Sequence, residues 1–138
     1  MSVIALDVGD QSIGVAVSDP TATFALPLCT IKRRSKAEDV TEISRIIEER
    51  TIETMVVGLP LDLQGKPGPQ AKKVKNFITF LKRRINLPVI FIDERYTTQM
   101  AGRAMIAMGI KRGKEKGIED ALAASYILEM YLKKSGDD

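Results

Sequence analysis

Apolar residues follow one spacing in some segments of this chain and a different spacing in others. Short apolar runs bounded by Gly, Pro, Asn or Asp are typical of β-strands, and apolar positions that recur every three to four residues indicate helices. The first pattern predicts strands at residues 3–8, 13–18, 24–31, 55–58 and 89–93. The second pattern predicts helices at residues 37–50, 70–85, 97–108 and 118–133. The predicted order is therefore βββαβαβαα.

This order predicts an α/β fold with one mixed five-stranded sheet and helices on both faces. The first two strands are joined by the short turn Gly9-Asp10-Gln11-Ser12, so they pair antiparallel, whereas strand–helix–strand crossovers give parallel neighbours. The first, fourth and fifth strands can then be parallel and adjacent. Ligands gather beyond the carboxyl ends of such strands. With 138 residues, the chain is expected to form a single domain, residues 1–138.

Three carboxylates stand at boundaries of these predicted elements. Asp7 is the next-to-last residue of the first strand, Glu94 follows the fifth strand, and Asp120 opens the last apolar helix. A charge at the end of an apolar strand is costly unless it is compensated, and clustered acids repel unless a divalent cation lies between them. We therefore predict Asp7, Glu94 and Asp120 as catalytic residues and as ligands of Mg²⁺ or Mn²⁺, in a two-metal site for phosphodiester hydrolysis.

Each acid also has a structural explanation. Asp7 could be a solvent-facing residue of a hairpin, and Asp120 could be an acid in a first helical turn, which the helix dipole favours without any function. Gly14, in the second strand, would permit close approach of a phosphate or of another strand.

Composition narrows the possible chemistry. The chain has no histidine and a single cysteine, Cys29, which is expected to be a buried and inert thiol. Ser-His and Cys-His nucleophile pairs and histidine-containing zinc sites are therefore excluded. No run is apolar enough for a membrane span and no signal peptide is recognised, so we expect a cytoplasmic protein.

Basic residues are concentrated in three blocks, although the net charge is only +3. No acidic residue lies between Asp62 and Asp93, a second block covers residues 32–36, and a third covers residues 111–116. Such blocks favour a polyanionic partner, because phosphate neutralisation releases counterions. The predicted nucleic-acid contacts are Arg95, Lys66, Lys72, Lys111, Arg112, Lys114 and Lys116.

Several segments together resemble the YqgF family of pre-16S rRNA nucleases, also described as Holliday-junction-resolvase-like. They are Leu6-Asp7-Val8-Gly9, Ile13-Gly14-Val15-Ala16-Val17-Ser18-Asp19-Pro20, Val56-Val57-Gly58-Leu59-Pro60-Leu61, Gly65-Lys66-Pro67-Gly68-Pro69-Gln70-Ala71, Asp93-Glu94-Arg95-Tyr96-Thr97-Thr98 and Asp120-Ala121-Leu122-Ala123-Ala124. The resemblance implies a ribonuclease H-like fold and cytoplasmic processing of the 5′ end of pre-16S rRNA; whether the RNA is bound free or on the ribosomal subunit stays open. Carried over by position, the family's acidic site falls on Asp7, Glu94 and Asp120. The chain departs from the family pattern at Asp10, Gln11, Ser12 and Glu115.

Three other functions are compatible with parts of this pattern. A resolvase acting on branched DNA would use the same acids, and it would require a homodimer rather than a monomer. A nucleic-acid-binding factor for transcription or ribosome assembly would need none of the acids. An actin-like ATPase shares the D-x-G turn but requires two such domains, which this chain is too short to form.

Overall fold

The computed structural model describes residues 2–62, 64–94 and 116–136, and for residues 116–118 and 135–136 it describes the backbone alone. The strands are β1 (Ser2–Val8), β2 (Ser12–Ser18), β3 (Ala25–Lys32), β4 (Ile52–Leu59) and β5 (Val89–Asp93). The helices are α1 (Lys36–Arg50), α2 (Pro69–Leu81) and α4 (Lys116–Gly136). The helix predicted at 97–108 and most of the basic segment that follows it lie outside the described residues.

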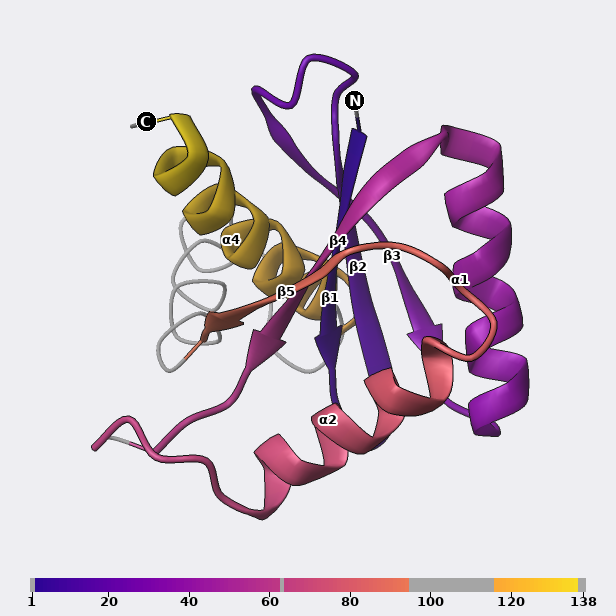
Figure 1. Ribbon diagram of the computed structural model, residues 1–138, viewed down its shortest axis with the longest axis vertical. Coiled ribbons are helices and arrows are strands. Elements are labelled where there is room, and N and C mark those ends of the chain that lie inside the picture. Colours follow the sequence, from indigo (N-terminus) through magenta and orange to yellow (C-terminus); the bar gives the residue numbers. More distant parts are fainter. Residues whose placement is uncertain (1, 63, 95–115, 137–138) are drawn as a thin grey trace.

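The five strands form one mixed sheet in the order β3-β2-β1-β4-β5, as Figure 1 shows. β1 pairs antiparallel with β2, and β2 pairs antiparallel with β3. β4 runs parallel to both β1 and β5. The predicted α/β class, the mixed sheet and the adjacency of the first, fourth and fifth strands are therefore confirmed.

Each face of the sheet has its own apolar core. Ile4 and Leu6 of β1 point to the face covered by α1 and α2, where Phe77 is almost fully buried. Val3 and Ala5 point to the opposite face, which α4 covers. Because side chains alternate along a strand, Asp7 belongs to the α4 face. The prediction of helices on both faces is confirmed.

The structure corrects two predicted helix boundaries. α2 ends at Leu81 and not at residue 85, although Ile85 is still buried; the apolar spacing continues through a turn that follows the helix. α4 begins at Lys116, so Asp120 is the fifth residue of this helix and does not open it. Among the described residues, no helix has the length and apolarity required to cross a membrane.

Candidate active site

Asp7 lies near the carboxyl end of β1, in the centre of the sheet, where its register partner on β2 is Gly14. Burial raises the pKa of the Asp7 carboxyl, a hydrogen bond with the Glu94 side chain lowers it, and the charge of Asp120 raises it again. The net shift is upward. Among the described residues, no cation contributes to this shift.

Glu94 reaches Asp7 across the intervening strand β4. Its backbone N–H donates to the Leu59 carbonyl oxygen at 3.3 Å, which continues the pairing of β4 with β5. A Cβ atom at Gly58 would lie 2.7 Å from the Glu94 carboxyl carbon. The missing side chain at Gly58 therefore leaves the space through which Glu94 crosses β4 to contact Asp7.

Asp120 approaches from α4, which packs on the same face of the sheet. A Cβ atom at Gly14 would lie 2.0 Å from the Asp120 carbonyl oxygen, so the helix backbone rests directly on β2. The close approach predicted at Gly14 is real, but its partner is a helix and not a phosphate or a strand. The Ser12 hydroxyl donates to Asp120 Oδ2 at 2.6 Å, which fixes the carboxylate beside the β1–β2 turn.

The three predicted acids thus meet on one face of the sheet, although they come from distant parts of the chain. Asp7 and Glu94 share a hydrogen bond, and Asp120 is close enough for its charge to act on Asp7. Carboxylates this close together repel one another unless a compensating charge lies between them. Within the described chain, no group of three acidic or other ligating side chains is already arranged to hold a metal ion. Asp120 instead points its Oδ2 at Ser12.

A pocket of about 360 Å³ opens beside these acids. Its lining residues come from β1, from the β1–β2 turn and from α4; they are Asp7, Gly9, Asp10, Gln11, Ser12 and Asp120. Asp10 stands at its exposed rim, where Lys73 of α2 lies 3.4 Å from Oδ1. The pocket is polar and open, which suits a phosphate group better than an apolar ligand.

Sequence reasoning missed three contributors to this site. Ser12 was noted only as a departure from the family pattern, yet it binds Asp120. Gly58, inside a strand, is the kind of residue that marks a close approach, and this signal could have been used. Arg33 belongs to a basic block that predicts a polyanionic partner, but its side chain points inward and is only 20% exposed.

The predicted nucleic-acid contacts are only partly described. Lys66 and Lys72 are exposed, on the loop before α2 and on α2 itself. Arg95, Lys111, Arg112 and Lys114 lie outside the described residues, and the side chain of Lys116 does as well.

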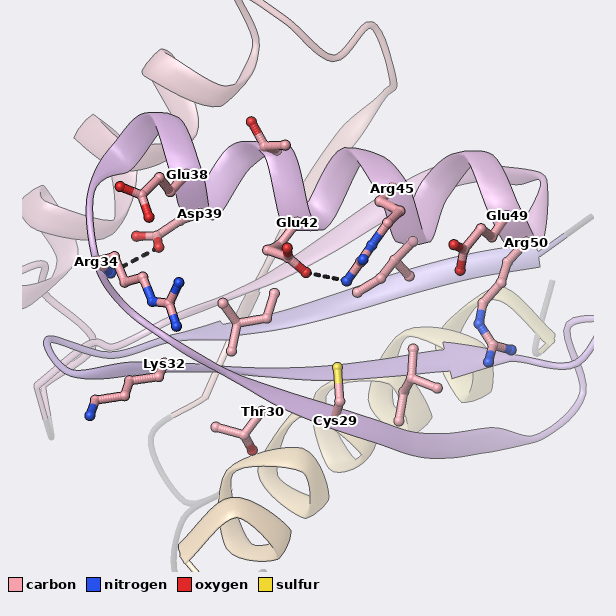
Figure 2. Close-up of a pocket in the computed structure, with 14 residues that line it drawn as sticks. Cys29, Thr30, Lys32, Arg34, Glu38, Asp39, Glu42, Arg45, Glu49 and Arg50 are labelled. Carbon is pink, nitrogen blue, oxygen red and sulfur yellow. Dashed lines mark hydrogen bonds and ion pairs between the residues drawn. The ribbon is translucent and has the colours of Figure 1, made fainter.

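A larger groove, of about 640 Å³, lies between β3 and α1, as Figure 2 shows. Four basic and four acidic side chains line it; they are Lys32, Arg34, Arg45, Arg50, Glu38, Asp39, Glu42 and Glu49. Cys29 is half-buried in its floor, less buried than expected, and burial raises the pKa of its thiol. None of the three predicted acids lines this groove, and its charges balance, so it does not compete as the active site.

Comparison with known proteins places this chain in a family. The family model described as "RuvX: Holliday junction resolvase" matches residues 1–134. Relatives from Clostridium botulinum (42% identical over 132 residues) and Caldanaerobacter subterraneus (46% over 133 residues) each cover 96% of this chain and 96% of their own length. Both are named "Putative pre-16S rRNA nuclease".

Among solved structures, Thermus thermophilus RuvC in complex with a Holliday junction substrate has the same fold. Its TM-score is 0.62 at 16% identity, over 98% of this chain and 96% of that one. The fold is therefore the ribonuclease H-like one that the sequence led us to expect. The name that both relatives carry, pre-16S rRNA nuclease, confirms the resemblance drawn from the sequence. The chain belongs to the family described as RuvX.

Proposed function

We propose that this chain is a divalent-metal-dependent nuclease that hydrolyses RNA phosphodiester bonds, with pre-16S rRNA as its substrate. The observation that carries the proposal is the meeting of Asp7 and Glu94 across Gly58, with Asp120 beside them. The substrate is suggested by the name that the Clostridium and Caldanaerobacter relatives share.

The acids fit a hard divalent cation such as Mg²⁺ or Mn²⁺. All three offer carboxylate oxygens, which are the ligands that these ions prefer. Asp7 is half-buried with a raised pKa, and its described neighbours supply no positive charge. A cation between Asp7 and Glu94 would offset the repulsion of the two carboxylates. Asp7 and Glu94 would be the first ligands, and Asp120 would join when its carboxylate turns from Ser12.

The residues of the chain position both the ion and the phosphate. A bound divalent cation supplies a water of lowered pKa and offsets the negative charge that develops at phosphorus. Asp7 is central to the site because β1 is flanked by β2 and β4, so its backbone cannot shift. Ser12 donates to Asp120 and holds that carboxylate beside the β1–β2 turn, from where it would turn toward the cation. The open polar pocket beside them admits a phosphodiester.

A basic surface borders this pocket. We define the α2 surface as the exposed cations of the loop before α2, of the helix and of the turn after it; they are Lys66, Lys72, Lys73, Lys75, Lys82, Arg83 and Arg84. The contact between Lys73 and Asp10 ties this surface to the pocket rim. A polyanionic strand lying along α2 would therefore pass the carboxylates.

The test is cleavage of a pre-16S rRNA fragment by the purified chain with and without Mg²⁺. Asp7→Asn and Glu94→Gln should abolish metal-dependent cleavage while the circular dichroism spectrum stays unchanged. Glu129→Gln is the matched control, because Glu129 is an exposed acid on α4, the helix that carries Asp120. Undiminished cleavage by Asp7→Asn would overturn the proposal.

A second candidate is resolution of four-way DNA junctions, because the matching family model is described as a Holliday junction resolvase. Adding a labelled junction to the same assay separates the two substrates. Preferential and symmetric junction cleavage, together with a dimer in sedimentation, would replace RNA as the substrate. Cleavage of RNA by a monomer would eliminate the junction.

A further inference from the structure

The β1–β2 turn, residues 9–12, connects the strand that carries Asp7 to the serine that binds Asp120. Such a turn would ordinarily be a mobile hairpin tip. Here its Gly9 N–H donates to the Ser12 carbonyl oxygen at 2.9 Å, and further contacts reach it from outside. Two of these contacts come from Arg33, the first residue after β3.

Arg33 binds two carbonyl oxygens of this turn. Its backbone N–H donates to the Gln11 oxygen at 2.9 Å, and its Nη1 donates to the Gly9 oxygen at 2.8 Å. Gly9 is only two residues beyond Asp7. The guanidinium therefore fixes the path of the chain as it leaves the central acid.

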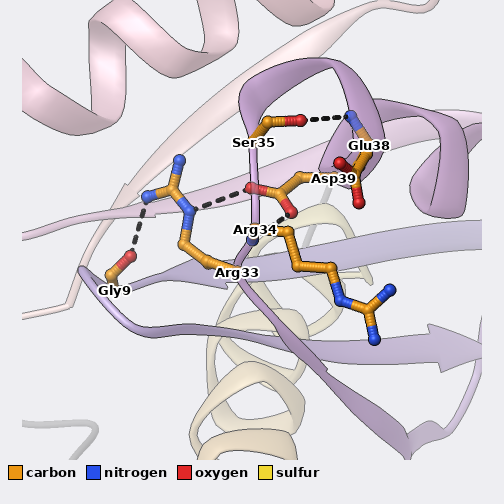
Figure 3. A network of polar contacts seen from close by, with 6 residues as sticks. All are labelled: Gly9, Arg33, Arg34, Ser35, Glu38 and Asp39. Atoms are coloured by element: carbon orange, nitrogen blue, oxygen red, sulfur yellow. Dashed lines mark hydrogen bonds and ion pairs between the residues drawn. The ribbon is translucent and has the colours of Figure 1, made fainter.

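The guanidinium of Arg33 is itself held by two helices, as Figure 3 shows for its contact with α1. Arg33 Nε donates to Asp39 Oδ2 at 3.2 Å, and the guanidinium carbon lies 4.8 Å from the centre of the Phe77 ring on α2. Asp39 Oδ1 accepts from the Arg34 N–H at 3.1 Å, and the Asp39 side chain is only 3% exposed. Because both oxygens of the buried Asp39 carboxylate accept hydrogen bonds, the guanidinium of Arg33 is held in one position.

The turn is thus held by hydrogen bonds on both faces of the sheet. On the face of α1 and α2, Arg33 binds Gly9, and on the face of α4, Ser12 binds Asp120. We infer that Arg33 and Asp39 are positioning residues for the active site, which fix the turn between Asp7 and Ser12 from outside the metal ligands. This inference rests on the proposed nuclease function, and it adds a determinant of rate on the face of the sheet opposite α4.

Arg33→Lys and Asp39→Asn test this inference in the full-length chain. Arg33→Lys keeps the charge but loses the planar donors that join Gly9 to Asp39. Substitution of residues that orient metal ligands without binding the metal lowers metal affinity or activity by about 10- to 100-fold. We expect the single-turnover cleavage rate to fall by about that factor, and Mn²⁺ affinity measured by calorimetry to weaken, while the dissociation constant for RNA stays constant. Arg45→Lys and Glu42→Gln are the controls, because this exposed ion pair lies on α1 without contacting the turn.

If Arg33 and Asp39 only stabilised the fold, both substitutions would lower the melting temperature and leave the cleavage rate, the Mn²⁺ affinity and the RNA affinity unchanged. That result would overturn the inference. If both variants fail to fold, hydrogen exchange of the unaltered chain decides. The Arg33 amide should then exchange as slowly as the amides of β1, and fast exchange would overturn the inference. If the unaltered chain cleaves neither RNA nor junctions, the proposed function fails, while Mn²⁺ affinity and amide exchange still test the role of Arg33.

Discussion

Gly14→Ala is the most direct perturbation of the site, because it adds one methyl group where α4 rests on β2. The new Cβ would lie 2.0 Å from the Asp120 carbonyl oxygen and 2.5 Å from its carbonyl carbon, whereas real Cβ contacts are essentially never shorter than 3.0 Å. The helix must therefore retreat by about 1 Å. β2 cannot yield instead, since β1 and β3 flank it.

Two measurable effects follow from this displacement. Overpacking of this size costs about 1–3 kcal/mol of unfolding free energy, and the cost should be near the upper limit because backbone, not a flexible side chain, is displaced. A misplacement of about 1 Å at a catalytic group can lower the rate by about 100-fold. We therefore expect Gly14→Ala to lower stability in urea unfolding and to lower metal-dependent cleavage by a larger factor than stability alone explains.

Gly68→Ser is the control for this prediction. A Cβ atom at Gly68 has no heavy atom within 4 Å, and the residue caps α2, where serine is at least as favourable as glycine. Its stability should equal or exceed that of the unaltered chain. If Gly14→Ala were as stable and as active as the unaltered chain, α4 would not lie on β2 as described, and Asp120 would lose its place in the site.

Three further predictions follow. Burial and the Asp120 charge raise the pKa of Asp7 above its ordinary value of 3.8. The folded state therefore binds this proton more tightly than the unfolded chain does. Stability is then lost as the pH rises through the folded pKa. Asp7→Asn should therefore raise the melting temperature at neutral pH without divalent metal and lose this advantage at about pH 4; a destabilised variant at neutral pH would contradict the burial argument. Gly58→Ala would place a Cβ 2.7 Å from the Glu94 carboxyl group, so Glu94 should leave Asp7 and the Mg²⁺ concentration for half-maximal cleavage should rise; an unchanged Mg²⁺ requirement would argue against Glu94 as a ligand. Lys66→Ala and Lys72→Ala should each reduce the salt dependence of RNA binding by about 0.7–0.9 in log–log slope, measured by fluorescence anisotropy, whereas an unchanged slope would place the RNA elsewhere.

Much of the fold could be predicted from local sequence pattern. Each described strand was located to within a few residues, because short apolar runs ended by turn residues have few alternatives at this length. The order of the strands followed from the short connection at residues 9–12 and from the crossover helices. The start of α4 was missed because Lys116 and Gly117 carry no apolar signal, although the helix includes them.

The details of the site were less accessible. Asp7 and Glu94 could be chosen because charge at the end of an apolar strand is unusual, and their meeting follows from strand order, whereas Asp120 stands in a helix, where an acid is ordinary. Arg33 could not be separated from its exposed neighbours Lys32 and Arg34, since three consecutive cations give no sign of which one turns inward. Its partner Asp39 resembles an ordinary acid of a first helical turn. The tertiary structure distinguishes this pair, because Arg33 packs on Phe77 and binds Gly9, and the Asp39 side chain is buried.

The site depends on two glycines, which lack side chains, as much as on the three acids. Glu94 contacts Asp7 because Gly58 leaves a passage, and Asp120 approaches because Gly14 lets a helix backbone rest on a strand. The two kinds of substitution should therefore affect the protein differently. Neutralising Asp7 removes a buried charge and should stabilise the chain while stopping cleavage, whereas filling either glycine should lower both stability and cleavage. A chain in which Asp7→Asn and Gly14→Ala changed stability in the same direction would not have its acids held in this way.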